Sequence, residues 1–408
     1  MKNKFSTITL RHARFYKRFL MLLLHKHILN ENTKASLKIY IFTHFKNTYT
    51  QRHLKNLALT VTLLLITASY GQAVRKYSNE FLNIGVDAAA LGMSNAVTAS
   101  SNDVNAAYWN PAGLVHLEDH QASFMHASYF ANIAQYDYLA YAKPIDDRSA
   151  YAISVIRFGV DDILNTTELI DGQGNIDYNR IKLFSVADYA FTFSYARELQ
   201  VPGFQYGVNA KVIRRTIGEF ANSWGFGFDL GVQFERNDWK FGLMVRDITT
   251  TYNIWNIDEE AYAKIANAIP GENQELPEST EITLPKAQFG VAKKWEFHNE
   301  MTLLAATNLN MRFAQTNDII STKAVSIDPA LGFEVGYTDL VYFRTGVGNF
   351  QNITQLDGSQ QVGFQPNIGL GFKYKGIQID YALTDLGDQS AALYSNIFSV
   401  KVDLSIFR

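Results

Sequence analysis

Residues 224–235 read Trp-Gly-Phe-Gly-Phe-Asp-Leu-Gly-Val-Gln-Phe-Glu, in which large apolar residues alternate with small or polar ones. Successive side chains of a β-strand point to opposite faces, so this stretch has one apolar and one small or polar face. The same alternation returns in residues 189–196 and 398–406. The pattern predicts a protein built from β-strands, and the clearest apolar row is Phe226, Phe228, Leu230, Val232 and Phe234.

About fourteen such strands are expected from residue 121 onward, and their connections sort by length. We predict them at 121–130, 135–143, 149–164, 186–198, 205–219, 224–235, 239–252, 281–297, 300–313, 327–337, 339–350, 366–374, 376–384 and 393–407. Every second connection is short, and those between include long ones at 165–185, 253–280, 314–326 and 351–365. An up-and-down barrel places successive connections at opposite ends, and bacterial barrels keep the short turns in the periplasm. A soluble sandwich has no reason to sort its loops in this way.

The fold class that follows is all-β, a transmembrane antiparallel β-barrel spanning residues 121–408 in the outer membrane. An even number of strands puts both termini on the periplasmic side. Charged residues on the small face of the strands should point into the lumen, because each would cost about 2–4 kcal/mol at mid-depth in lipid. Both signs occur, so we expect ion pairs across a packed or plugged interior, formed by Asp229, Arg312, Glu334, Lys373, Asp380, Lys401 and Asp403.

Composition narrows the chemistry. The chain has 408 residues, no cysteine and a formal charge of −2. The absence of cysteine removes disulfides, thiolate metal sites and cysteine nucleophiles, and the near-neutral charge argues against a nucleic-acid partner. No Gly-x-Ser-x-Gly elbow, P-loop or dinucleotide fingerprint is present. We therefore expect a protein that is not an enzyme and has no cofactor.

The N-terminal region has the features of an export signal. The apolar run at 57–68 follows Arg52 and Lys55 and precedes Gly71-Gln72-Ala73. It is shorter than the roughly 20 residues that a spanning helix needs, so it is typical of a secretory signal peptide. We expect cleavage near Ala73. Residues 1–50 are longer than an ordinary basic leader, and we expect them to be an extension upstream of the true translation start.

Residues 74–120 do not alternate and are rich in small residues. An Asn-Pro pair followed by Gly marks a rigid turn within Trp109, Asn110, Pro111, Ala112, Gly113 and Leu114. A segment of this size before the first strand is suited to fold into the barrel mouth as a plug or hatch. An ordinary periplasmic cap is compatible with the same residues.

Two blocks of this segment carry a resemblance to a known family. Residues 75–96, Arg-Lys-Tyr-Ser-Asn-Glu-Phe-Leu through Ser-Asn-Ala, resemble the opening of the PorV/PorQ family, and 105–114 resemble its signature. Residues 246–253, Arg-Asp-Ile-Thr-Thr-Thr-Tyr-Asn, with Trp255, are similar to a strand end of that family. The resemblance covers essentially 75–408. The Asn-Pro-Ala-Gly-Leu piece is also similar to one in FadL-type barrels, which move hydrophobic molecules.

The resemblance implies a FadL-like barrel of about fourteen strands in the outer membrane of a Bacteroidetes-type bacterium. It implies a non-enzymatic role in type IX secretion, either receiving cargo from the translocon through the cargo's C-terminal domain or anchoring the surface-attachment complex. The partners implied are those proteins together with outer-membrane lipid. The alternative is a FadL-like channel for uptake of hydrophobic small molecules, which requires an apolar cavity. A lipid hydrolase would need a nucleophile with a base, and none is visible.

Two further groups of residues bear on function. The predicted outer loop at 253–280 contains a short amphipathic stretch from Asp258 to Lys264, and a loop of this length is more often functional than filler. Its candidates for partner contact are Trp255, Tyr262 and Ile265, with a lid over the barrel mouth as the alternative. Three histidines, at 116, 120 and 126, should point in different directions along a strand, so we expect no metal site.

Overall fold

The computed structural model describes residues 78–129, 132–170, 173–268, 278–297, 300–355, 357–384 and 395–407. All of them lie within the unit Val74–Arg408. The expected signal peptide, its cleavage site and the upstream extension lie outside the described residues.

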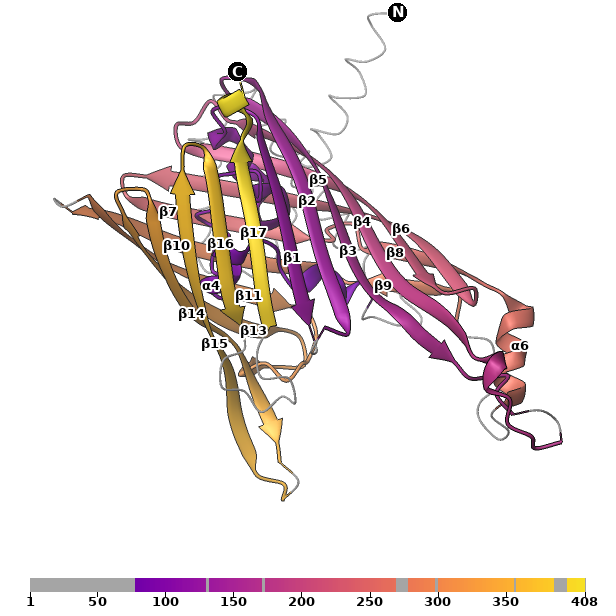
Figure 1. Ribbon diagram of the computed structural model, residues 1–408. Helices are drawn as coiled ribbons and strands as arrows, with labels where there is room; N and C mark the ends of the chain where they lie inside the picture. Colours follow the sequence, from indigo (N-terminus) through magenta and orange to yellow (C-terminus); the bar gives the residue numbers. More distant parts are fainter. Residues whose placement is uncertain are drawn as a thin grey trace, which may run out of the picture. The chain divides into compact units, whose positions relative to one another are not determined.

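The strands form one closed antiparallel sheet, a barrel (Figure 1). Neighbours in the chain are neighbours around most of the wall, and the pairing of β1 with β17, Gln121 opposite Asp403, closes the ring. The strands are β1 Gln121–Tyr129, β2 Ala134–Asp146, β3 Ser149–Asn165, β4 Lys182–Glu198, β5 Phe204–Ile217, β6 Ala221–Arg236, β7 Trp239–Arg246, β8 Thr251–Ile257, β9 Thr280–Thr283, β10 Lys286–Phe297, β11 Met301–Arg312, β12 Ile320–Ser321, β13 Ser326–Tyr337, β14 Val341–Thr354, β15 Gln360–Tyr374, β16 Ile377–Thr384 and β17 Ser395–Asp403.

Seventeen labelled strands make fourteen wall strands in the described part of the chain. β7 and β8 pair in turn with β6 and are two halves of one wall strand, interrupted at 247–250. β9 and β10 are the halves of the next, interrupted at Leu284-Pro285, where proline has no N–H to donate. The two-residue β12 only adds to the edge of β13. The predicted fold class, a barrel of about fourteen strands, is confirmed.

Three predicted boundaries were wrong. The outer loop predicted at 253–280 is shorter, because β8 continues to Ile257 beyond the interruption. The loop predicted at 351–365 is a hairpin of β14 and β15 that extends past the wall, at the end away from the C-terminus (Figure 1). The last strand ends at Asp403, and Leu404–Phe407 form a short 3-10 helix, so Leu404 and Ile406 do not continue the outer row.

The outer surface of the wall is apolar. Large side chains on alternate positions are about half exposed, including Phe226 at 60% and Phe228 at 51% on β6. Similar rows lie on other strands, for example Phe191 and Phe193 on β4 and Leu370 and Phe372 on β15. A continuous apolar belt on a closed barrel is the surface that lipid requires, and it places the protein in the outer membrane. Among the described residues, no helix is long and apolar enough to span a membrane.

The connections differ in length at the two ends of the barrel, as the sequence pattern predicts. One end carries tight turns such as Asn237-Asp238, between β6 and β7, and Lys375-Gly376, between β15 and β16. The other end carries the connection from β3 to β4 and the connection from β8 to β9, which contains helix α6, Glu259–Ala268. These are called the short-turn end and the long-loop end below.

Candidate functional site

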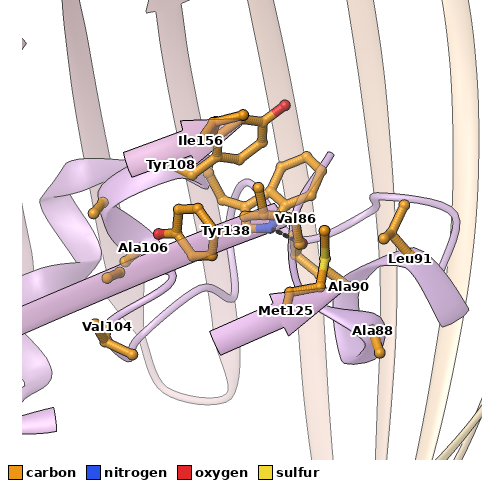
Figure 2. Packing of buried hydrophobic residues seen from close by; sticks show 14 of the residues in the cluster. Val86, Ala88, Ala90, Leu91, Val104, Ala106, Tyr108, Met125, Tyr138 and Ile156 are labelled. Carbon is orange, nitrogen blue, oxygen red and sulfur yellow. Dashed lines mark hydrogen bonds between the residues drawn. The ribbon is translucent and has the colours of Figure 1, made fainter. Parts of the chain in front are cut away.

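The segment before β1 lies inside the barrel, and we call residues 78–117 the plug. It contains η1 Glu80–Asn83, α4 Ala88–Gly92, α5 Ala106–Trp109 and η2 Pro111–His116. One side of the plug is apolar and packs against the first three wall strands. Figure 2 shows Val86, Val104 and Tyr108 of the plug beside wall residues that point inward, which are Met125 of β1, Tyr138 of β2 and Ile156 of β3.

The Asn-Pro turn at 109–114 of the plug is stabilised by hydrogen bonds from the side chains of Trp109 and Asn110. The Trp109 indole Nε1 donates a hydrogen bond to the carbonyl of Val86 at 3.0 Å. The Asn110 carboxamide accepts from the backbone N–H of Ala112 and donates to the carbonyls of Thr98 and Val232, at 3.0 and 3.1 Å. Since Val232 belongs to β6, the Asn-Pro turn ties the plug both to itself and to the wall.

This turn packs against the inner face of the wall strands, which carries small residues. A Cβ added at Gly207 of β5 would lie 2.4 Å from the carbonyl carbon of Pro111. One added at Gly231 of β6 would lie 2.1 Å from the Asn110 side-chain oxygen. Neither distance can be met by a real side chain without displacing the plug. Gly207 and Gly231, on the small-residue face of β5 and β6, are therefore positions that admit the plug.

A second contact joins residues 105–114 of the plug to the wall segment 246–253. Arg246, the last residue of β7, donates from Nη2 to the carbonyl of Tyr108 at 2.9 Å. Its guanidinium also lies over the Tyr108 ring, 4.3 Å from the centroid. Arg246, the first residue of the wall segment 246–253, therefore contacts Tyr108, the neighbour of Trp109 in the plug.

Ion pairs fill the polar side of the lumen. Lys211 of β5 lies 2.7 Å from Asp229 and 2.8 Å from Asp247, and all three side chains are buried. Arg344 of β14 contacts Glu334 and Asp380, at 2.5 and 2.7 Å. In addition, Lys401 of β17 pairs with Asp103 of the plug, so an ion pair also fastens the plug to the wall.

Most of the predicted lumen residues form ion pairs or hydrogen bonds inside the barrel, and Lys373 is exposed to solvent. Asp229, Glu334, Asp380 and Lys401 belong to these pairs, and Arg312 pairs with Asp318 at 2.9 Å. Asp403 accepts a hydrogen bond from Gln121 on β1. Lys373 lies opposite Gln378 on the lumen face, but at the short-turn end, where its side chain is exposed to solvent.

Two cavities separate the plug from the wall. The outer cavity, about 300 Å³, lies toward the long-loop end between the plug and β7, β10, β11 and β13 to β15. The inner cavity, about 200 Å³, lies toward the short-turn end and is lined by Asp87, Asp103, Glu334, Arg344 and Lys401 among others. Trp109 lines both cavities.

Asp87 of the plug faces the inner cavity and is buried. Its carboxylate accepts hydrogen bonds from the Ser399 hydroxyl at 3.0 Å and from the backbone N–H of Ala89. Burial, reinforced by the nearby Asp380 carboxylate, raises the pKa of Asp87 to about 6. Its ionised form therefore destabilises the folded protein at neutral pH, since the pKa in the unfolded chain is about 3.9.

We predict that Asp87→Asn stabilises the folded barrel at about pH 8, by on the order of 2 kcal/mol, because the amide keeps both accepted bonds without a buried charge. The advantage should shrink as the pH falls through 6, where the native carboxyl takes up its proton before the unfolded one. Urea unfolding followed by gel mobility at about pH 5 and pH 8 measures this. The matched variant Asp103→Asn should destabilise instead, because it leaves Lys401 without its partner. Equal stability changes at both pH values would contradict the assignment.

The residues predicted for partner contact lie in different places. Trp255 was expected in a loop, but it lies on the lumen side of β8, where the Arg215 guanidinium covers its ring at 5.2 Å. Its contact with a partner stays a prediction. The predicted short helix is confirmed as α6, and Asp258 begins it by accepting from the backbone N–H of Ala261 at 2.9 Å. Tyr262 lies on α6 and is half-buried. Ile265 also lies on α6, and its side chain is outside the described residues.

The three histidines have separate partners. His116 lies 3.4 Å from Glu235, His120 contacts the Tyr141 hydroxyl at 2.7 Å, and His126 contacts Asp137 at 2.7 Å. Across the described ranges no three histidine or carboxylate side chains converge as metal ligands would. His120 and His126 therefore act as hydrogen-bonding residues, and His116 lies within ion-pair distance of the wall.

The comparisons with protein-family models and with curated proteins gave no match. Among solved structures, the chain is similar to a FadL homologue of Pseudomonas aeruginosa, with 13% identity, 78% of this chain and 98% of that chain covered, and a TM-score of 0.45. It is similar to the toluene transporter TodX of Pseudomonas putida, with 10% identity, 78% and 98% covered, and a TM-score of 0.47. It is also similar to the toluene transporter TbuX of Ralstonia pickettii, with 11% identity, the same coverage and a TM-score of 0.44.

Proposed function

We propose that the protein is a non-enzymatic, plugged outer-membrane barrel that serves as a docking component of type IX secretion and surface attachment. The observation that supports this best is the seating of the plug. Its apolar side packs on β1 to β3, and its polar side is fastened through Asn110 and Asp103 to β6 and β17. A lumen occupied in this way offers surfaces for proteins rather than a wide path for small molecules.

The surface proposed for docking lies at the long-loop end, with α6 as its centre. The helix begins with two acidic residues, Glu259 and Glu260, and Asp258 caps it. The protruding β14–β15 hairpin is a second projection at the same end (Figure 1). The partners proposed are translocon or attachment proteins and the C-terminal domains of cargo, which the resemblance of residues 75–96 and 105–114 suggests.

A deletion strain tests this proposal. We expect loss of the gene to leave secreted cargo in the periplasm, and expression of the intact chain to restore its release. A version with 259–268 replaced by a Gly/Ser segment of equal length should restore less. Gly-Ser in place of the Asn237-Asp238 turn, at the short-turn end away from the proposed surface, serves as the control. Affinity capture from solubilised membranes should recover translocon or attachment proteins. Normal secretion in the deletion strain, with no such partner captured, would rule the proposal out.

The second candidate function is a FadL-like channel for hydrophobic small molecules. One arrangement favours it, since the outer and inner cavities approach each other from the two ends and only Trp109 is shared between them. The similar solved structures are named as a FadL homologue, toluene transporters and a monoaromatic hydrocarbon channel, and none of these names refers to secretion. The charged and amide lining of both cavities suits an apolar solute poorly.

Replacing Trp109, the residue that lines both cavities, distinguishes the two functions. If the barrel is a channel, Trp109→Ala should join the cavities and raise the uptake of toluene into intact cells several-fold. If the barrel is a docking component, the same substitution should leave toluene uptake at the level of the deletion strain. Trp255→Ala, which removes an inward-facing indole away from both cavities, is the matched control.

A further inference from the structure

Carboxamide side chains are prominent in the lining of the outer cavity. Seven of the twenty residues around it are asparagine or glutamine, contributed both by the plug and by the wall. The wall carboxamides come from four strands, β10, β11, β14 and β15. A carboxamide both donates and accepts hydrogen bonds, so this cavity presents paired donors and acceptors around its circumference.

The charged groups of the outer cavity are already engaged. Lys286 lies 3.3 Å from Glu80, and Arg312 lies 2.9 Å from Asp318. Arg246 is occupied by the Tyr108 carbonyl and by Gln288, to which its Nε donates at 3.1 Å. Asp328 accepts from the backbone N–H of Phe350. Lys286 and Arg312 are thus paired with carboxylates, whereas Arg246 and Asp328 are held by hydrogen bonds to neutral groups. This one cation and one anion offset each other, which argues for a ligand without net charge.

The carboxamides are held in a fixed orientation. Arg246 donates to the side-chain oxygen of Gln288, and Gln288 donates in turn to Asn310 at 2.9 Å. From the plug, the side-chain oxygen of Asn95 is buried and has no partner among the described residues. Such an acceptor is costly to bury unless something donates to it. The cavity is therefore lined by polar groups of fixed orientation, and the Asn95 side-chain oxygen can accept a hydrogen bond from a ligand.

Aromatic rings complete the site. Tyr108 and Trp109 of the plug line the same cavity, and their rings meet edge to face with centroids 4.8 Å apart. Carboxamides combined with aromatic surface match the chemistry of a sugar, whose hydroxyls donate and accept while its C–H faces pack on rings. A volume of about 300 Å³ is at the small end of ligand pockets, which fits one or two sugar units.

We propose that the outer cavity is a binding site for a neutral saccharide of one or two sugar units, reached from the long-loop end. An apolar solute of the same size would leave the carboxamides unpaired, and an anion would have to displace Glu80 or Asp318 from their cations. The site does not depend on the proposed docking role, and its failure would leave that role intact.

Calorimetric titration of the purified barrel in detergent tests the site, with glucose, galactose, mannose, N-acetylglucosamine, maltose and lactose as probes and decanoate as the apolar comparison. We expect saturable binding of at least one sugar and none of decanoate. Gln288→Leu should weaken that binding by about tenfold or more, since it removes the centre of the amide row. Asn83→Ala, on the plug, should weaken it without touching the wall, which guards against a folding defect in the first variant.

Gln361→Leu is the matched control, because this glutamine lies on the exposed part of β15 outside the cavity and should bind as the unaltered chain does. Failure of all six sugars to bind would overturn the proposal. So would binding of decanoate in competition with a sugar, or sugar binding that Gln288→Leu and Asn83→Ala both leave unchanged.

Discussion

Gly207→Val is expected to open the barrel to ions. The new side chain would begin 2.4 Å from the carbonyl carbon of Pro111, a backbone atom that cannot yield, so the turn of the plug must leave its seat on β5. The wall itself should survive, because valine suits a strand and its neighbours in the sheet are unchanged. Planar-bilayer recordings should then show ion conductance at least about tenfold above that of the unaltered protein.

Gly363→Val provides the control for this result. An added Cβ there meets the flexible end of Ile353 on the β14–β15 hairpin and touches no plug residue, so conductance should stay at the level of the unaltered chain. A Gly207→Val barrel that folds and yet conducts no more than this control would show that the plug does not close the lumen.

Lys211→Met is expected to cause a large loss of stability. Lys211 is buried between Asp229 and Asp247, and methionine fills its space without its charge. Removing one member of a buried ionic group leaves the others uncompensated, at a cost of about 3–5 kcal/mol. Urea unfolding of the purified barrel, followed by the gel mobility of folded and unfolded forms, measures the difference.

The triple variant Lys211→Met, Asp229→Asn, Asp247→Asn separates charge from packing. It removes all three charges together, so it should recover most of the stability lost by Lys211→Met. Lys240→Met, which breaks a partly exposed pair with Glu235, should cost about 1 kcal/mol or less. If the triple variant were as unstable as the single one, the loss would come from packing and not from buried charge.

The wall could be predicted from the sequence because its pattern is local. Alternation fixes which face each residue occupies, and it places Asp229 and Asp380 in the lumen without knowledge of their partners. The same reasoning could have found Lys211 and Arg344, which lie on the small or polar face of β5 and β14.

The site could not be predicted in the same way, because it arises from contacts between distant parts of the chain. The contact of Arg246 with Tyr108 spans more than a hundred residues, and nothing local to either residue signals it. The interruption at 247–250 hid the continuation into β8, and this turned Trp255 from a predicted loop residue into an inward-facing one. Fixing the position of the plug required its pairing with Gly207 and Gly231 across the lumen.

Disulfide trapping in outer membranes tests most directly whether the plug occupies the lumen as described. The chain has no cysteine, so paired substitutions give an unambiguous product. Gly92 of α4 and Gly369 of β15 are in close contact, since a Cβ on Gly92 would lie 3.0 Å from the Gly369 Cα. Gly207 lies on β5, seven wall strands away around the ring. We predict that Gly92→Cys with Gly369→Cys forms a disulfide in the folded protein, whereas Gly92→Cys with Gly207→Cys does not. Absence of the first disulfide, or equal formation of both, would contradict a plug fixed in this position.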